Sequence, residues 1–305
     1  MSNQPQVKEV RDLLFGTAPR PVKCGHDVVI GGGEVYPEIN FTLPSMGLDP
    51  KDREPSRKQY SEMIEAVCQR AVDLLAPAIV VEVELLPPMT MAPDWGAEIT
   101  SVVRETLDRF HEKYGLRSAF RLTPVDVRDS ERPPKMRQGE YYEATIQTFE
   151  QCAKAGADML AIESTGGKEL HDEALLNGDL GAAVFALGVL GVNDMQFLWE
   201  KIVGIAKNTK TIAAGDTACG FANTAMVLAD KGMIPRVFAA VDRVASVVRS
   251  LQAIKMGAVG PSKDCAYEGP YLKALTGIPI SMEGKSAACA HLSHVGNIAG
   301  ACCDL

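Results

Sequence analysis

The sequence predicts an α/β fold of the TIM (β/α)8-barrel type, built as a single domain with an irregular N-terminal segment. Three observations lead to this expectation: helical patterns alternate with short apolar strands, glycines separate several helices from the next strand, and eight strand candidates can be counted. The chain has 305 residues, 46% of them apolar, enough for one large core. We therefore expect an N-terminal extension over residues 1–26 and a barrel domain over residues 27–305.

The strand candidates are short apolar runs, most of which end in polar turns. The run at 182–190, AAVFALGVL, fits either a strand or a buried helix, and its glycines favour the strand. Glycines 31–33 lack the GxGxxG spacing of a dinucleotide loop and are interpreted as a bend. The eight candidates cover residues 27–32, 79–85, 119–125, 159–163, 182–190, 211–215, 257–260 and 278–282.

Between most of these strands, apolar residues recur at three- and four-residue steps, which is the pattern of amphipathic helices. Gly115 and Gly156 follow two such stretches and can take the left-handed conformation that closes a helix. Residues 41–55 lack apolar periodicity and are expected to form a loop. Because helices and strands alternate with short connections, we expect parallel strands joined by right-handed crossovers. The expected helices cover residues 56–76, 98–114, 141–155, 193–207 and 221–230.

Composition excludes several classes of function. The formal net charge of -8 and the pI near 5.3 disfavour binding to a phosphate backbone, so no nucleic-acid partner is expected. The N-terminus has no apolar signal-peptide core, and no run approaches 18 apolar residues, so we expect a cytoplasmic protein without membrane spans. Eight cysteines are too few and too scattered for a disulfide scaffold, which favours reduced thiols as core residues or metal ligands.

Three polar turns each hold a possible metal ligand directly after an apolar run: Glu163, Cys219 and Cys265. In a barrel of parallel strands all such turns emerge on one face, so ligands about fifty positions apart in sequence can meet at one ion. Two cysteines and one glutamate leave the fourth position of tetrahedral zinc open, as in a catalytic site. Gly215-Asp216-Thr217 precedes Cys219, and the amide donors and dipole of the helix that starts just after it are expected to favour the thiolate that zinc needs.

Other polar motifs are weaker candidates. Glu82 and Glu84 lie on one side of the strand 79–85, where they either line the mouth of the barrel or lie under neighbouring helices. The Gly-Lys-Ser at 284–286 resembles part of a phosphate loop, but Pro279 stands where its first glycine is required. No histidine pair matches a recognisable metal motif, and His291 and His294, one helical turn apart, are interpreted as packing residues.

The segments around these three ligand candidates resemble one protein family. IESTGGKE around Glu163, AGDTACGFANTAM around Cys219 and GAVGPSKDCAYE around Cys265 are similar to the zinc-containing catalytic (B) subunit of methanol:corrinoid methyltransferases. DWGAE at 94–98 and EGKSAACAH at 283–291 add to the resemblance, which runs from about Leu14 to Cys303. Members of that family continue with a further helical region, whereas the printed chain stops at Leu305.

The resemblance implies a TIM barrel, one zinc ion per chain, methanol as substrate and methyl transfer to a Co(I) corrinoid. It also implies a homodimer within a hetero-oligomer. The corrinoid is expected on a partner protein, because the chain lacks a DxHxxG segment of the kind that binds cobalamin. Hydroxide is a poor leaving group, so zinc is expected to act as a Lewis acid on the oxygen of methanol. Asp216 or Glu84 is the expected proton donor.

Three alternatives remain at the level of sequence. A related corrinoid methyltransferase would use a methoxylated aromatic or a methylamine as methyl donor, and pocket volume would separate it from a methanol enzyme. A zinc-dependent aldolase or hydrolase on the same barrel would turn over without cobalamin. A catalytically silent scaffold would bind zinc without methyl transfer.

Overall fold

The computed structural model describes residues 5–43, 48–264 and 269–282. It contains a 3-10 turn η1, a π-helical turn η2, helices α1–α11 and strands β1–β9. In chain order these are η1 (Val10–Leu13), β1 (Thr17–Cys24), β2 (Val28–Gly32), β3 (Glu38–Phe41), α1 (Glu54–Asp73), β4 (Ile79–Leu85), α2 (Pro87–Thr90), α3 (Pro93–Tyr114), β5 (Ser118–Pro124), α4 (Glu140–Lys154), β6 (Met159–Ile162), α5 (Lys168–Leu176), α6 (Leu180–Phe185), η2 (Ala186–Gly191), α7 (Val192–Thr209), β7 (Ile212–Asp216), α8 (Cys219–Asp230), α9 (Arg236–Ala245), α10 (Val247–Met256), β8 (Ser262–Asp264), α11 (Gly269–Thr276) and β9 (Ile280–Met282).

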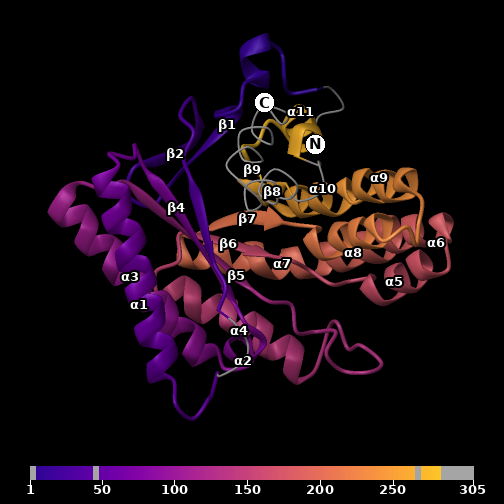
Figure 1. Cartoon of the computed structure of the whole chain (residues 1–305), viewed down its shortest axis with the longest axis horizontal. Helices are drawn as coiled ribbons and strands as arrows, with labels where there is room; N and C mark the ends of the chain where they lie inside the picture. The colour runs from indigo at the N-terminus through magenta and orange to yellow at the C-terminus, as the bar shows by residue number, and fades with distance from the viewer. Residues whose placement is uncertain (1–4, 44–47, 265–268, 283–305) are drawn as a thin grey trace.

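A five-stranded parallel sheet in the order β3-β4-β5-β6-β7 runs through the molecule (Figure 1). Strands β8 and β9 form a separate parallel pair. The backbone amides of Val259 and Gly260 donate to the carbonyl oxygens of Ala213 and Ala214, so the chain approaching β8 runs along β7. The predicted α/β class with parallel strands is confirmed.

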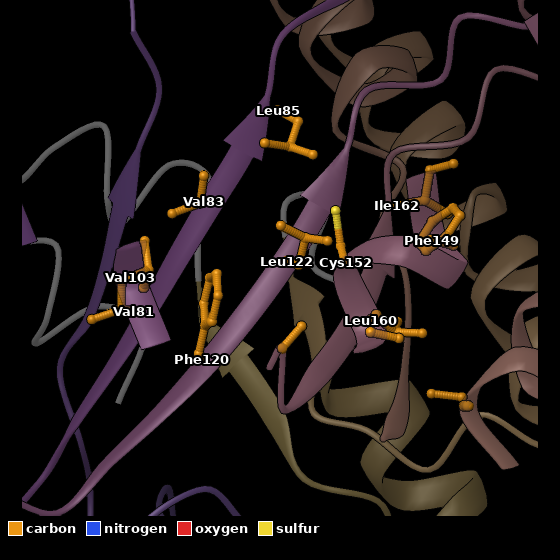
Figure 2. Packing of buried hydrophobic residues seen from close by; sticks show 14 of the residues in the cluster. Val81, Val83, Leu85, Val103, Phe120, Leu122, Phe149, Cys152, Leu160 and Ile162 are labelled. Atoms are coloured by element: carbon orange, nitrogen blue, oxygen red, sulfur yellow. The ribbon is translucent and has the colours of Figure 1, made fainter. Parts of the chain in front are cut away.

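The two faces of this sheet have opposite chemistry. Val81 and Val83 of β4 and Leu122 of β5 point into the apolar core formed with the helices, as Figure 2 shows. The alternating residues point the other way: Glu82 accepts a hydrogen bond of 2.6 Å from the hydroxyl of Thr123, the next strand's residue on that face. Glu82 and Glu84 therefore line the polar face of the sheet and do not lie under the helices that cover its apolar face.

Arg121 crosses this polar face and links four segments. Its Nε donates to Oε1 of Glu38 on β3 at 2.6 Å, and its Nη2 donates to Oγ of Ser281 on β9 at 3.0 Å. Its Nη1 donates to the carbonyl oxygen of Pro261, immediately before β8, at 2.9 Å. The β8–β9 pair therefore lies opposite the polar face of β5 and encloses it.

The N-terminal hairpin departs from the expected organisation. Residues 17–24, predicted to be irregular, form β1, which pairs antiparallel with β2. The predicted strand 27–32 exists as β2, but its partner is β1 and not a strand of the parallel sheet. Cys24 and Val28 pack against Ala78, at the amino end of β4, in a second apolar cluster. The hairpin thus packs at the amino ends of the parallel strands, where apolar side chains need a cover.

Two further strand predictions are wrong and one strand is missed. Residues 182–190 are helical, because Asp179 caps α6 through the amide of Ala182 at 2.9 Å and the helix continues through η2 into α7. No strand is assigned at 257–260, and β8 begins two residues later, after a cis Gly260-Pro261 bond. Strand β3 was missed because its four residues include polar Glu38 and Asn40, which face the polar side.

The other predicted elements are confirmed within a few residues: strands β4, β5, β6, β7 and β9, and helices α1, α3, α4, α7 and α8. Gly115 takes the predicted left-handed conformation after α3, with φ of 68°. Cys24, Cys68 and Cys152 are buried free thiols, as expected for core residues. Within the described residues, Leu180–Thr209 is the helical stretch whose length and composition would allow it to span a membrane, and 33% of its apolar window is buried.

Candidate metal centre

Glu163 lies at the carboxyl end of β6, between the ends of two other strands. It forms a parallel bridge with Val125, which directly follows β5, and the preceding Ile162 pairs with Asp216 of β7. Its side chain is partly buried. The backbone at Glu163 is therefore held from both sides by the ends of neighbouring strands, and this limits where its carboxylate can lie.

Cys219 is the first residue of α8, three residues beyond the end of β7. Its side chain is 6% exposed, and Thr217 donates a hydrogen bond from Oγ1 to its sulfur at 3.3 Å. The amide of Thr217 also donates to the carbonyl oxygen of Ile162 at 3.1 Å, which joins the loop to the end of β6. The sulfur of Cys219 therefore lies at the N-terminus of α8, beside a hydroxyl group and close to the end of β6.

Glu163 and Cys219 thus emerge from the same ends of two neighbouring strands, as the sequence predicts. Cys265, the third predicted ligand, lies outside the described residues, immediately after β8. The described part of β8 approaches β7, because Ser262 donates from Oγ to the carbonyl oxygen of Asp216 at 3.1 Å. No group of three metal-binding side chains is assembled among the described residues alone. The complete ligand set therefore stays a prediction.

Asp216, one of the two predicted proton donors, is fully buried at the end of β7. Its Oδ1 accepts a hydrogen bond of 3.1 Å from the amide of Ser164, the residue after Glu163. Burial raises the pKa of Asp216 to about 6, although Arg249 and the Ser164 amide act in the opposite direction. A carboxyl group with a pKa near the working pH suits proton transfer.

Glu84, the other predicted proton donor, has a lowered pKa, whereas the pKa of Asp216 is raised. Burial by itself would raise its pKa, but the charge of Lys263 and hydrogen bonds from Thr42 and Asn40 lower the pKa below its usual value. Thr42 Oγ1 and Asn40 Nδ2 donate to the carboxylate at 2.6 and 2.7 Å. Glu84 is therefore a carboxylate at neutral pH, and Asp216 is chemically the better proton donor.

Glu82 and Glu84 instead hold the strand that leads to Cys265. The Nζ of Lys263, on β8, lies 2.8 Å from Oε2 of Glu82 and 3.5 Å from Oε1 of Glu84. Both Lys263 and Glu82 are nearly fully buried, at 4% and 1% exposure. Removing one partner of such a pair is costly, so this ion pair constrains where β8 lies relative to β4.

Sequence reasoning missed a second buried network, which contacts the loop after Glu163. Arg128 pairs with both Asp126 and Asp194, each at 2.8 Å. Asp126 in turn accepts hydrogen bonds from the amide and hydroxyl of Thr165 at 2.9 and 3.1 Å. A single sequence does not mark these residues, because Arg128 and Asp194 are 66 positions apart and each resembles a surface residue.

A cavity of about 480 Å³ lies beside the loop that follows Glu163. Thr165, Gly167 and Lys168 form one side of it, and Arg132 and Met136 contribute to the rest. Neither Glu163 nor Cys219 lines this cavity. This cavity therefore lies beside the candidate ligands, and its volume is not the volume of a substrate pocket at Glu163 and Cys219.

Comparison with known proteins identifies the family. A family model described as the methanol-cobalamin methyltransferase B subunit matches residues 2–305. The methanol--corrinoid protein co-methyltransferase of Methanosarcina barkeri is 41% identical over 298 residues, covering 96% of this chain and 64% of that protein. A chain in the crystal structure of the methanol:cobalamin methyltransferase complex MtaBC from Methanosarcina barkeri superposes with a TM-score of 0.88 at 39% identity, covering 97% of this chain and 64% of that one.

The chain spans just under two thirds of the length of these relatives. Within that span the match is nearly continuous, and it includes the β6 and β7 ends that carry Glu163 and Cys219. The chain belongs to the methanol-cobalamin methyltransferase B subunit family.

Proposed function

We propose that this chain carries the catalytic centre of a zinc-dependent methyltransferase, which transfers the methyl group of methanol to the Co(I) corrinoid of a partner protein. Family membership and the names of its relatives support this reaction. The structural observation that carries the proposal is the placement of Glu163 and Cys219 at the carboxyl ends of β6 and β7. These ends are joined by the hydrogen bond from Thr217 to Ile162.

The donor set fits zinc. A buried cysteine at a helix N-terminus and a partly buried carboxylate are ordinary zinc ligands, and Cys265 would add a second thiolate. Glu163, Cys219 and Cys265 would hold the ion and leave one position for the substrate. Zinc supplies Lewis acidity that weakens the C–O bond of methanol.

The reaction balances with one proton. The C–O bond of methanol breaks, the electron pair of Co(I) forms the new Co–C bond, cobalt becomes Co(III), and the oxygen leaves as water after gaining a proton. Asp216 is the proposed proton source because its pKa of about 6 keeps it near the working pH. Glu84 is instead a charged partner of Lys263.

A closed TIM barrel, with its domain in residues 27–305, is the proposed architecture around this centre. The bonds of Arg121 to β3, β9 and the segment before β8 support it, because they place the β8–β9 pair opposite β5. Strand β2, within that range, belongs to the hairpin at the amino ends and not to the proposed wall. The carboxyl ends of the strands would then carry the site, as in other TIM-barrel enzymes.

We further propose that the protein acts in the cytoplasm with a separate corrinoid-binding subunit and forms a homodimer within that hetero-oligomer. The relative in the MtaBC complex supports the corrinoid partner. The site must then open at the carboxyl ends of the strands widely enough to admit a bound corrinoid.

The test is a methyl-transfer assay. Zinc-loaded protein is mixed with methanol and a corrinoid subunit reduced to Co(I), and the absorption spectrum is followed for methyl-Co(III). We expect the product with methanol and none without zinc. Methoxylated aromatics and methylamines serve as competing donors. Failure with methanol in the presence of a competent corrinoid subunit would contradict the proposal, and turnover of another substrate without cobalamin would favour an aldolase or hydrolase.

A further inference from the structure

Arg249 on α10 is fully buried, and its guanidinium contacts the loop that follows Glu163. Nη1 donates to the carbonyl oxygen of Gly166 at 2.6 Å, and Nη2 donates to the carbonyl oxygen of Ser164 at 2.9 Å. Nη2 also donates to the hydroxyl of Ser164. Three hydrogen bonds from one planar group therefore set the path of the backbone directly after the candidate ligand.

The same guanidinium also reaches the segment that carries Cys219. Its Cζ atom lies 4.2 Å from the centroid of the ring of Phe221. Phe221 lies on α8, two residues after Cys219. Its Nε lies 3.8 Å from Oδ2 of Asp216, at the end of β7. Arg249 is thus in contact with the β6 loop, the β7 end and the start of α8 at once.

The surrounding backbone makes room for this arginine. A Cβ at Gly191, the last residue of η2, would lie 2.3 Å from Nη1 of Arg249. Single π-helical turns are often found at functional sites, and here the turn brings a glycine against the guanidinium. Burying an arginine is expensive unless its donors are satisfied, and the site satisfies them mainly with the loop after Glu163.

The same loop is also held by the Asp126–Arg128–Asp194 network. Thr165 bonds to Asp126, which is paired with Arg128, while Ser164 and Gly166 bond to Arg249. Both networks therefore bind the loop after Glu163. Of Arg128 and Arg249, it is Arg249 that also contacts the start of α8. This distinguishes Arg249 from Arg128.

We propose that Arg249 is a positioning residue that sets the carboxylate of Glu163 relative to the sulfur of Cys219, and so determines the geometry and affinity of the metal centre. The inference rests on the proposed function, in that it takes these two side chains to be metal ligands. Neighbours that orient metal ligands typically change metal affinity by roughly 10–100-fold when they are replaced.

The experiment compares Arg249→Met with wild-type protein and with Arg104→Met. Arg104 is a matched control because it is also mostly buried and forms an ion pair, with Asp158 at 3.1 Å. Asp158 directly precedes β6, at the end of the strand away from Glu163. Zinc affinity is measured by competition with a chromogenic chelator. Cobalt(II) is then substituted, and its thiolate charge-transfer and d–d absorption report the ligand geometry independently of activity.

We expect Arg249→Met to weaken zinc binding by roughly 10–100-fold and to alter the cobalt spectrum, while Arg104→Met leaves both close to wild type. Gly191→Ala, which displaces the guanidinium without removing it, should act in the same direction and covers the case in which Arg249→Met does not fold. Unchanged affinity and spectrum in a folded Arg249→Met or Gly191→Ala protein would overturn the inference. If wild-type protein binds no stoichiometric zinc, the proposed metal centre fails first, and the inference with it.

Discussion

Cys219, a proposed metal ligand, combines burial with two features of its local structure. It is almost fully buried, it begins α8, and it accepts a hydrogen bond from Thr217. Burial alone would favour a neutral thiol, as it does for Cys68, whose pKa rises to about 12. Cys219 differs from Cys68 in its position at a helix N-terminus and in the hydroxyl of Thr217 beside its sulfur.

Replacing Cys219 with alanine is expected to abolish stoichiometric zinc, because two remaining ligands hold the ion too weakly. The same loss is expected for Cys265→Ala. Metal content after gel filtration, determined by atomic absorption, measures the effect. Cys68→Ala is the matched control, since it removes an equally buried thiol on the inward face of α1 and should retain one zinc per chain. Full zinc retention by Cys219→Ala would remove this residue from the ligand set.

Asp216 should make the stability of the metal-free protein depend on pH. Burial raises its pKa from 3.8 to about 6, so the folded state holds this proton to higher pH than the unfolded state does. The corresponding stability is complete below about pH 4 and is lost as the pH rises through about 6. Across that window the unfolding free energy of wild type, relative to Asp216→Asn, should fall by roughly 3 kcal/mol. Urea unfolding from pH 4 to 7 measures this difference, and a flat profile would contradict the assignment.

At the scale of elements, strand β5 shows how alternation separates core from site. Phe120 and Leu122 point into the helix-covered core, whereas Arg121 and Thr123 point to the polar face. The strand is fully buried on both faces, yet only one face is apolar. Helix packing on one side and the ion-pair network on the other therefore hold the same strand.

Leu122→Ala should destabilise the protein by about 2–5 kcal/mol, because it removes buried methyl groups and leaves a cavity between β5 and the helices. Chemical denaturation measures the loss. Val237→Ala on α9 is the control, because that valine is 70% exposed and its truncation should change stability by less than about 0.5 kcal/mol. Equal losses in the two variants would mean that the core face of β5 is wrongly assigned.

At the scale of the whole molecule, the β8–β9 pair is joined to the main sheet by polar contacts. Arg121 bonds to Ser281 and Pro261, and Lys263 pairs with Glu82. These charged groups lie inside the polar face, where their desolvation is offset only when every partner is present. The strand pair that leads to Cys265 therefore depends on a buried ion-pair network for its position.

Arg121→Met should cost about 3–5 kcal/mol of unfolding free energy, because it leaves the mostly buried carboxylate of Glu38 without its ion-pair partner. Adding Glu38→Gln should recover part of this loss, since the unpaired charge is then removed. Guanidinium unfolding of the single and double variants tests both expectations. Simple additivity of the two substitutions would argue against a coupled pair.

Local sequence was sufficient for elements with strong periodicity and clear termini. Strand β4 was predicted over residues 79–85 and the end of α3 at Tyr114, because a β-branched run and a helix-closing glycine, Gly115, are local signals. Glu163 and Cys219 were found in the same way, as polar residues at the ends of apolar runs. The order of strands along the chain then implied that their ends would be neighbours.

Tertiary structure decided what local signals leave ambiguous. The run at 182–190 is apolar enough for a strand, but it is helical, and its buried Ala183 packs in one apolar cluster with residues of α5, α8 and α9. Strand β3 has too few apolar residues to be recognised, and it exists because β4 offers it a paired edge and Arg121 a charge partner for Glu38.

The sequence by itself determined the α/β class, helices α1, α3, α4, α7 and α8, and the family, because these depend on periodicity and on contiguous motifs. Only the tertiary structure decided which carboxylates are ionised, where β1 and β2 pack, and that Arg249 contacts the segments of two candidate ligands. Each of these depends on burial and on pairs of residues far apart in the chain. The energies of these interactions depend on the exclusion of solvent in the folded protein, which the order of residues along the chain does not show.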